Sequence, residues 1–86
     1  MTEIIYKYET HLLRPTTLEL PVGAKIVHLA GEGHTFWIWR KFQTEEERTE
    51  RRTFSMFGTG QPFEGEHIAT VIDGVYVWHL VEIYDE

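Results

Sequence analysis

The dipeptide Asp73-Gly74 joins two stretches of β-forming residues, His67–Asp73 and Val75–Ile83. An Asp-Gly pair between two such stretches is the strongest short-range signal for a β-hairpin, and it suits a type I′ turn. The sequence therefore predicts an antiparallel pair of strands in its C-terminal part. Similar short runs, separated by turn residues, recur through the rest of the chain.

Five further runs have the composition of strands. They are Glu3–Glu9, Thr16–Leu20, Lys25–Ala30, Thr35–Phe42 and Arg52–Phe57. In the first, Ile4, Tyr6 and Tyr8 alternate with other residues at the period of two that is typical of a strand. Pro21-Val22-Gly23 predicts a hairpin between the second and third runs, and Gly31-Glu32-Gly33 predicts the next turn. The fold class predicted is all-β, a small antiparallel barrel or sandwich of about seven short strands.

One segment, Gln43–Arg52, is strongly charged. Thr44 followed by Glu47 has the form of a capping box, which allows at most one short helical turn near residues 44–50. A solvated hairpin loop is the alternative, and we favour it because the segment is too short for a stable helix.

The length of 86 residues predicts a single domain over residues 1–86. The sequence contains no cysteine, so neither disulfides nor thiolate metal sites can stabilise so small a core. Association with a second copy is the remaining way to stabilise it. A homodimer is therefore our expectation.

The net charge of −6 lies entirely in residues 64–86, because residues 1–63 hold eight acidic and eight basic side chains. This distribution argues against binding of a nucleic-acid backbone and permits either simple solubility or contact with a basic partner. Neither a signal peptide nor an apolar run of about 20 residues is present, so we expect a cytoplasmic protein without membrane contact.

Two of the predicted strands are apolar on both faces, although a small β domain builds only one core. In Thr35–Phe42, two tryptophans alternate with Phe36 and Ile38, and in Val75–Ile83 valines alternate with larger apolar residues. The second face must be covered by a loop, by sheet curvature or by another chain. We favour another chain, because tryptophan and tyrosine are frequent interface anchors. The predicted interface consists of Trp37, Trp39, Tyr76 and Trp78.

The segment Gly58-Thr59-Gly60 lacks the lysine and the following helix of a phosphate-binding P-loop, and it lacks the third glycine of a dinucleotide fingerprint. We predict a turn with positive φ at one or both glycines, stiffened by Pro62. The alternative is a nest of backbone N–H groups that holds a phosphate or nucleotide. That alternative site comprises Arg51, Arg52, Gly58, Thr59 and Gly60.

No arrangement of side chains in the sequence is typical of an enzyme. The five histidines lack metal-ligand spacing, and Ser55 lacks the Gly-x-Ser-x-Gly turn that would expose a nucleophile. His79, on an apolar strand, is predicted to be a hydrogen-bonded core residue. We therefore expect no catalytic residues, no metal and no cofactor.

Five segments of the chain form a recognisable series: IIYKYE, LELPVGAKIVHL, FWIWRKF, RTFSMFGTGQPF and VWHLVEI. The fourth contains the pattern R-x-F-x-x-x-GTG-x-P, made by Arg52, Phe54, Gly58, Thr59, Gly60 and Pro62. In this series the chain resembles a family of small tailed-bacteriophage proteins. The resemblance implies a phage origin, a location in the host cytoplasm and no established activity. It suggests binding of a host or defence protein or sequestration of a small nucleotide, and a minor virion component is a third hypothesis.

Overall fold

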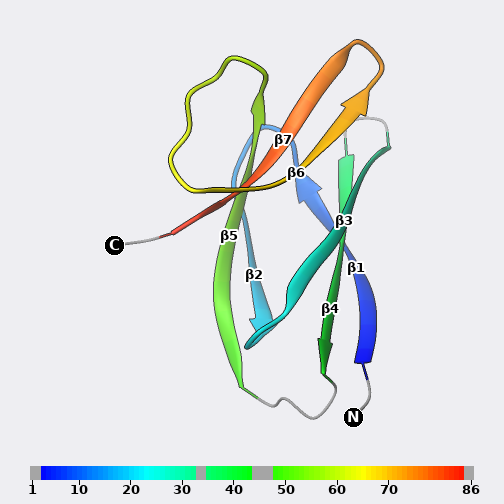
Figure 1. Cartoon of the computed structure of the whole chain (residues 1–86), viewed down its shortest axis with the longest axis vertical. Helices are drawn as coiled ribbons and strands as arrows, with labels where there is room; N and C mark the ends of the chain where they lie inside the picture. The colour runs from blue at the N-terminus through cyan, green and yellow to red at the C-terminus, as the bar shows by residue number, and fades with distance from the viewer. Residues whose placement is uncertain (1–2, 33–34, 44–47, 85–86) are drawn as a thin grey trace.

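The computed structural model describes residues 3–32, 35–43 and 48–84, which form seven strands in two antiparallel sheets (Figure 1). The strands are β1 (Glu3–His11), β2 (Thr16–Pro21), β3 (Lys25–Glu32), β4 (Thr35–Gln43), β5 (Thr49–Gly58), β6 (Glu66–Asp73) and β7 (Tyr76–Ile83). Sheet A has the order β1-β4-β3 and sheet B the order β2-β5-β7-β6. The all-β prediction is confirmed, and the two open sheets exclude a closed barrel. Of the predicted helical turn, residues 44–47 lie outside the described residues, and Thr49 and Glu50 belong to β5.

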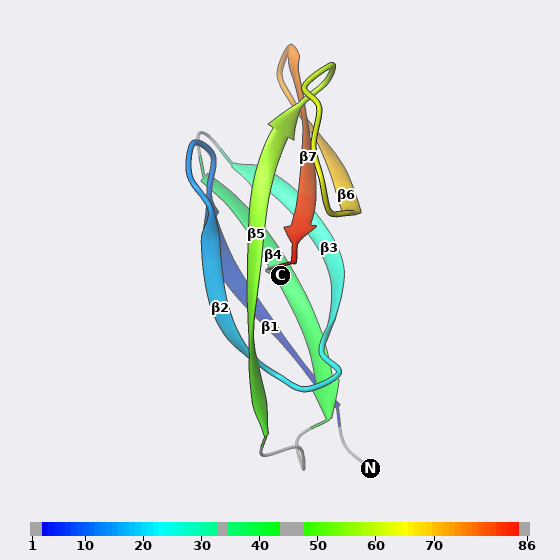
Figure 2. The same cartoon turned by 90° about the vertical axis from the view of Figure 1, so that its left-hand side faces the viewer.

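The hairpin predicted at Pro21-Val22-Gly23 is wrong. A turn is present, with Gly23 at φ +85° and a hydrogen bond from the Ala24 amide to the Pro21 carbonyl. However, β2 pairs with β5 and β3 pairs with β4, so this turn carries the chain from sheet B to sheet A (Figure 2). Local turn chemistry reverses the chain direction but does not decide which strands pair. At the next turn predicted, β3 continues through Glu32, and residue 33 lies outside the described residues.

The hairpin predicted at Asp73-Gly74 is confirmed, although its turn type differs. Asp73 remains in β6 and pairs with Tyr76, so the two loop residues are Gly74 and Val75. Gly74 has φ +63°, whereas Val75 does not have positive φ. Positive φ at only the first central residue is the signature of a type II′ turn rather than type I′.

The core lies between the facing surfaces of the two sheets, which we call their inner faces. Its buried apolar residues are Leu20, Ala24, Leu29, Phe36, Ile38, Phe54, Met56 and Leu80. Period-two alternation puts Phe36 and Ile38 on one face of β4 and the two tryptophans on the other, as predicted, and the structure shows that the face with Phe36 and Ile38 is the inner one. Thr10 is also buried, and its hydroxyl donates to the Phe36 carbonyl at 3.0 Å.

Towards its C-terminal end, strand β7 is buried on both faces, because Leu80 on the inner face and Val81 on the outer face are both inaccessible to solvent. The connection between β5 and β6 passes over the outer face at this point. A Cβ added to Gly65 of this connection would lie 2.9 Å from Val81 Cγ1. A loop of the same chain therefore covers Val81. The sequence had allowed a loop, sheet curvature or another chain as this cover.

A buried ion pair closes the inner side of sheet B. Arg52 donates from Nε and Nη2 to the two carboxylate oxygens of Glu82, at 2.8 Å each, and from Nη1 to the Ala24 carbonyl at 2.6 Å. Glu82 is only 4% exposed. The hydrogen bond to Glu82 raises the pKa of Arg52 above its ordinary value. This arginine therefore ties β5, β7 and the turn between the sheets together.

At the C-terminal end of β7, the hydroxyl of Tyr84 donates to Glu66 Oε2 at 2.5 Å. This hydrogen bond raises the pKa of Tyr84 from 10.0 to about 12. Since the folded value lies above the ordinary one, any stabilisation by this contact is complete below pH 10 and is lost as the pH rises through about 12. Titration of phenolate absorbance should show one tyrosine ionising near 12, and Glu66→Gln should return it towards 10. An unchanged titration in that variant would contradict the assignment.

Candidate functional site: an apolar end of the sandwich

The four aromatic residues predicted as one interface lie on two different sheets. Trp37 and Trp39 are on the outer face of sheet A, and both are half-buried. The ammonium of Lys7 lies 4.5 Å from the centre of the Trp37 ring, and the ring of His28 lies 5.0 Å from that of Trp39. Neighbouring strands of the same sheet therefore already cover part of these two side chains.

The other two aromatic residues, Tyr76 and Trp78, lie on β7 beside the tip of the β6–β7 hairpin. Trp78 is half-buried, and its ring meets that of Phe36 of the core edge-on, with 6.4 Å between their centres. Tyr76, whose ring centre is 6.4 Å from that of Trp78, is 64% exposed, and Val75 at the tip is 90% exposed. This end of the molecule thus combines an anchored indole with freely accessible apolar side chains.

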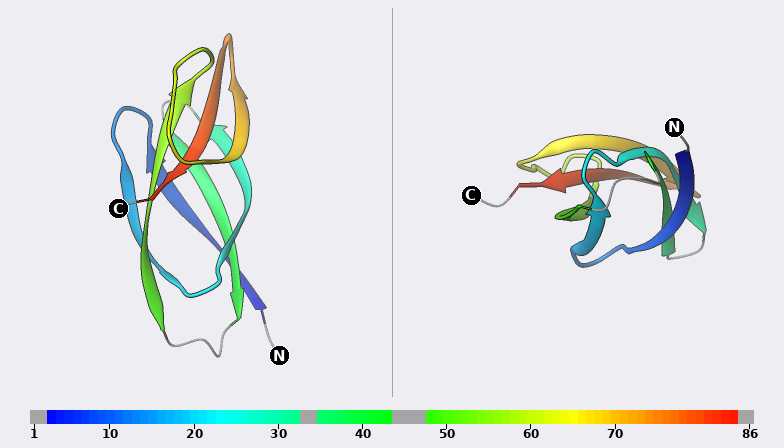
Figure 3. Two further views of the ribbon diagram at one scale, coloured as in Figure 1. Left: turned by 60° about the vertical axis from the view of Figure 1, so that its left-hand side comes forward. Right: turned by 90° about the horizontal axis from the view of Figure 1, so that it is seen from below.

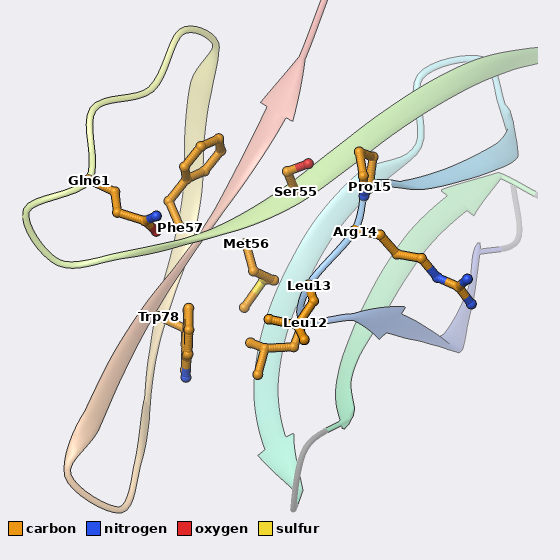
Figure 4. A pocket seen from close by; sticks show the side chains of 9 residues that line it. All are labelled: Leu12, Leu13, Arg14, Pro15, Ser55, Met56, Phe57, Gln61 and Trp78. Atoms are coloured by element: carbon orange, nitrogen blue, oxygen red, sulfur yellow. The ribbon is translucent and has the colours of Figure 1, made fainter.

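Two hollows flank Trp78. One has a volume of about 250 Å³ and lies between the β1–β2 connection, β5 and Trp78, with Leu12, Leu13 and Met56 among its lining residues (Figure 4). The other, of about 350 Å³, lies between the hairpin tip and the turn that follows β5. Leu13 beside the first hollow is 92% exposed. We call the surface formed by Leu12, Leu13, Val75, Tyr76 and Trp78 the apolar end.

One edge of β5 is free where it borders the first hollow. Strand β2 pairs with β5 only as far as Phe54, so among the described strands residues 55–58 pair on one side only, with β7. Gly58 uses both its amide and its carbonyl to bind Gln61, so its peptide groups point away from β7. Alternation along an antiparallel strand directs the peptide groups of Met56 to the same side. The hollow therefore offers hydrogen-bonding groups as well as apolar side chains.

The segment Gly58-Thr59-Gly60 forms a turn, as predicted. The Gln61 amide donates to the Gly58 carbonyl at 3.1 Å, and Gly60, the third residue of this turn, has φ +91°. This is the pattern of a type II turn. The side-chain oxygen of Gln61 accepts from the Gly58 amide at 2.6 Å. One N–H group of the hypothetical anion nest is therefore already occupied within the chain.

The structure does not bring Arg51 and Arg52 to this turn. Both lie in β5, and six or seven residues of extended strand place them about 20 Å from Gly58. Arg51 faces Glu19 on the outer side, with 3.9 Å between Nε and Oε1, whereas Arg52 is directed inward to Glu82. The extended strand therefore keeps the two arginines far from Gly58, although they are close to it in sequence. The five residues of the predicted anion site do not come together.

Residues 1–86 match the family model of a domain of unknown function, DUF7352. The chain belongs to the DUF7352 family. No curated protein and no solved structure matches it. Within the described part of this DUF7352 chain, no helix is long and apolar enough to cross a membrane. The family description assigns no activity.

Sequence reasoning did not anticipate a hydrogen-bonded chain of histidines and threonines in this DUF7352 domain. On the outer face of sheet B, the two ring nitrogens of His79 bind the hydroxyls of Thr59 and Thr70, at 2.9 and 2.8 Å. The Thr70 hydroxyl also lies 2.8 Å from Nε2 of His67. His79 is hydrogen-bonded, as predicted, but it lies half-buried outside the core, where it holds the turn after β5 onto the sheet. Among the described residues no group of three or more side chains could hold a metal ion.

Proposed function

We propose that this protein is a non-enzymatic accessory protein that acts by binding another protein through the apolar end. The observation that carries the proposal is the exposure of Leu13, Val75 and Tyr76 around an indole anchored in the core. Apolar side chains that stay in water next to hollows are typical of interaction sites. Binding energy at protein interfaces concentrates in aromatic anchors that fill or border such hollows.

The local structure favours this use of the apolar end. The hairpin turn holds Val75 and Tyr76, and Phe36 packs against Trp78, so a partner would order few side chains on binding. Preorganisation of this kind reduces the entropy cost of association. The free edge at Met56 adds backbone groups that could pair with an extended segment of the partner.

We propose a second copy of the chain as the simplest partner, because a cysteine-free domain of 86 residues gains stability by association. The resemblance to tailed-bacteriophage proteins supports a phage origin and action in the host cytoplasm. A host or defence protein is then the alternative partner.

Native mass spectrometry of the tagged protein, recovered from the cells that produce it, tests the proposal. We expect a dimer or a complex for the wild type, and an affinity at least about tenfold lower for Leu13→Asp and Val75→Asp, because each places a charge in the apolar contact. Both side chains are exposed, so the free energy of unfolding should change by less than about 0.5 kcal/mol.

Ile5→Asp is the matched control, because Ile5 is also an exposed apolar residue but lies on the outer face of sheet A. It should leave association unchanged. A wild type that stays monomeric and unbound, or variants at Leu13 and Val75 that associate normally, would contradict the proposal.

A further inference from the structure

Arg40 is a buried cation for which the described residues provide no counter-ion. It lies on the inner face of β4, at the end of sheet A away from the apolar end, and is only 6% exposed. None of the ion pairs that the described residues form includes it. Its Nε and Nη1 atoms are fully buried and have no hydrogen-bond partner among the described residues. An unpaired buried charge of this kind costs several kcal/mol, so its presence calls for a compensating group.

Aromatic rings compensate for only part of that cost. The guanidinium carbon lies 4.2 Å from the ring centre of Tyr8, 4.8 Å from that of Phe42 and 5.7 Å from that of Tyr6. Such contacts stabilise the charge through the ring faces. They do not satisfy the N–H groups in the plane of the guanidinium.

The hydrogen-bond pattern leaves one complete edge of the guanidinium free. Nη2 donates to the hydroxyl of Tyr8, and this uses one of its two hydrogens. If that hydrogen lies beside Nε, the edge formed by Nη1 and Nη2 stays free; if it lies beside Nη1, the edge formed by Nε and Nη2 stays free. Either edge presents two parallel N–H groups, which is the geometry that binds a carboxylate or phosphate in bidentate fashion. Tyr8, which accepts from Arg40, keeps its own hydrogen to donate.

A route from solvent to this position lies at the open side of the sandwich. Strand β1 is an edge strand of sheet A and β2 is an edge strand of sheet B, and the two are not paired with each other (Figure 3). Tyr6, on the inner face of β1, is nevertheless 46% exposed. Because the exposed Tyr6 ring lies 5.7 Å from the guanidinium carbon, we infer that rotation of this side chain would uncover the guanidinium.

We propose that the inner face of sheet A is a binding site for an oxyanion, a carboxylate or a phosphate, which the free edge of Arg40 and the hydroxyl of Tyr8 hold. The bound anion would neutralise the buried charge and satisfy its orphan N–H groups. This site goes beyond the proposed protein contact, because it uses none of the residues of the apolar end.

Titration of the ¹⁵N-labelled protein with sodium phosphate, and separately with sodium acetate, tests the site by NMR. Sodium chloride keeps the ionic strength constant, and the Nε–H resonance of Arg40 is followed. We expect a saturable shift of this resonance below about 100 mM anion, while the Nε–H resonance of Arg51, which is exposed, stays in place or drifts linearly. Saturation by acetate alone would define a carboxylate site and saturation by phosphate alone a phosphate site. Saturation by neither would overturn the proposal.

Variants separate binding by Arg40 from general salt effects. The thermal unfolding midpoint of the wild type and of Arg51→Met should rise with the anion that saturates the resonance, whereas that of Arg40→Met should not. Tyr8→Phe serves if Arg40→Met does not fold, and it should weaken the binding at least threefold by removing one donor. An anion response of Arg40→Met or Tyr8→Phe equal to that of the wild type would show that the anion binds elsewhere.

Discussion

Replacing Glu82 by Gln is expected to lower the free energy of unfolding by about 3–5 kcal/mol, because it leaves the guanidinium of Arg52 inside the sandwich without its counter-ion. Glu82 is almost fully buried and accepts from two nitrogens of Arg52, which also binds the turn between the sheets through Ala24. The change removes the charge but almost none of the volume, so cavity formation makes little contribution. Urea denaturation followed by tryptophan fluorescence gives the free energy directly.

Glu19→Gln is the matched control. Glu19 is exposed and pairs with Arg51, the neighbour of Arg52 in β5, over 3.9 Å. Surface pairs of this kind contribute at most about 1 kcal/mol, so the control should lose far less stability than Glu82→Gln. Equal losses of unfolding free energy in the two variants would show that the buried Arg52–Glu82 pair stabilises the fold no more than the exposed pair does.

Gly65→Ala is expected to have the second large effect. Gly65 has φ +140°, a conformation that costs a side-chain-bearing residue about 1–3 kcal/mol. In addition, an added Cβ would lie 2.4 Å from the Glu82 carbonyl oxygen and 2.9 Å from Val81 Cγ1. The loop after β5 must therefore move off the sheet, and exposure of Val81 adds about 1.5–3 kcal/mol. Denaturation measures the total, and faster hydrogen exchange in β7 would report the uncovering.

Gly60→Ala isolates backbone strain from this clash. Gly60 has φ +91°, but in the described part of the chain no atom lies within 4 Å of an added Cβ. The variant should show the strain cost alone and leave exchange in β7 unchanged. If Gly60→Ala and Gly65→Ala lower the free energy of unfolding equally, the close approach of Gly65 to Val81 adds no stability beyond the relief of backbone strain.

The two proposed binding regions have different physical origins. The apolar end exists because a short hairpin and a loop leave Leu13, Val75 and Tyr76 largely exposed to solvent. The Arg40 site exists because strand alternation directs a cation inward, among aromatic rings that cannot satisfy all of its N–H groups. Variants of one region should leave the other intact, because energetic effects of distant sites add.

The sequence by itself determined where the strands lie and where several of the turns between them fall. Period-two alternation and turn residues located all seven strands to within a few positions, and they put Phe36 and Ile38 on the same face of β4. The hairpin at Asp73-Gly74 and the positive φ of Gly60 were equally predictable. These features depend on residues close to one another in the chain, so local conformational preference is enough to specify them.

Only the tertiary structure decided which strands share a sheet and which side chains meet. In the folded chain, the turn at Pro21–Gly23 links the two sheets, and Arg52 lies far from the turn at Gly58. The loop at Gly65 covers Val81. It also left Arg40 buried without a carboxylate among its described neighbours. These outcomes depend on contacts between residues far apart in sequence, which form when the two apolar sheet faces are buried against each other. Local sequence patterns do not specify such contacts.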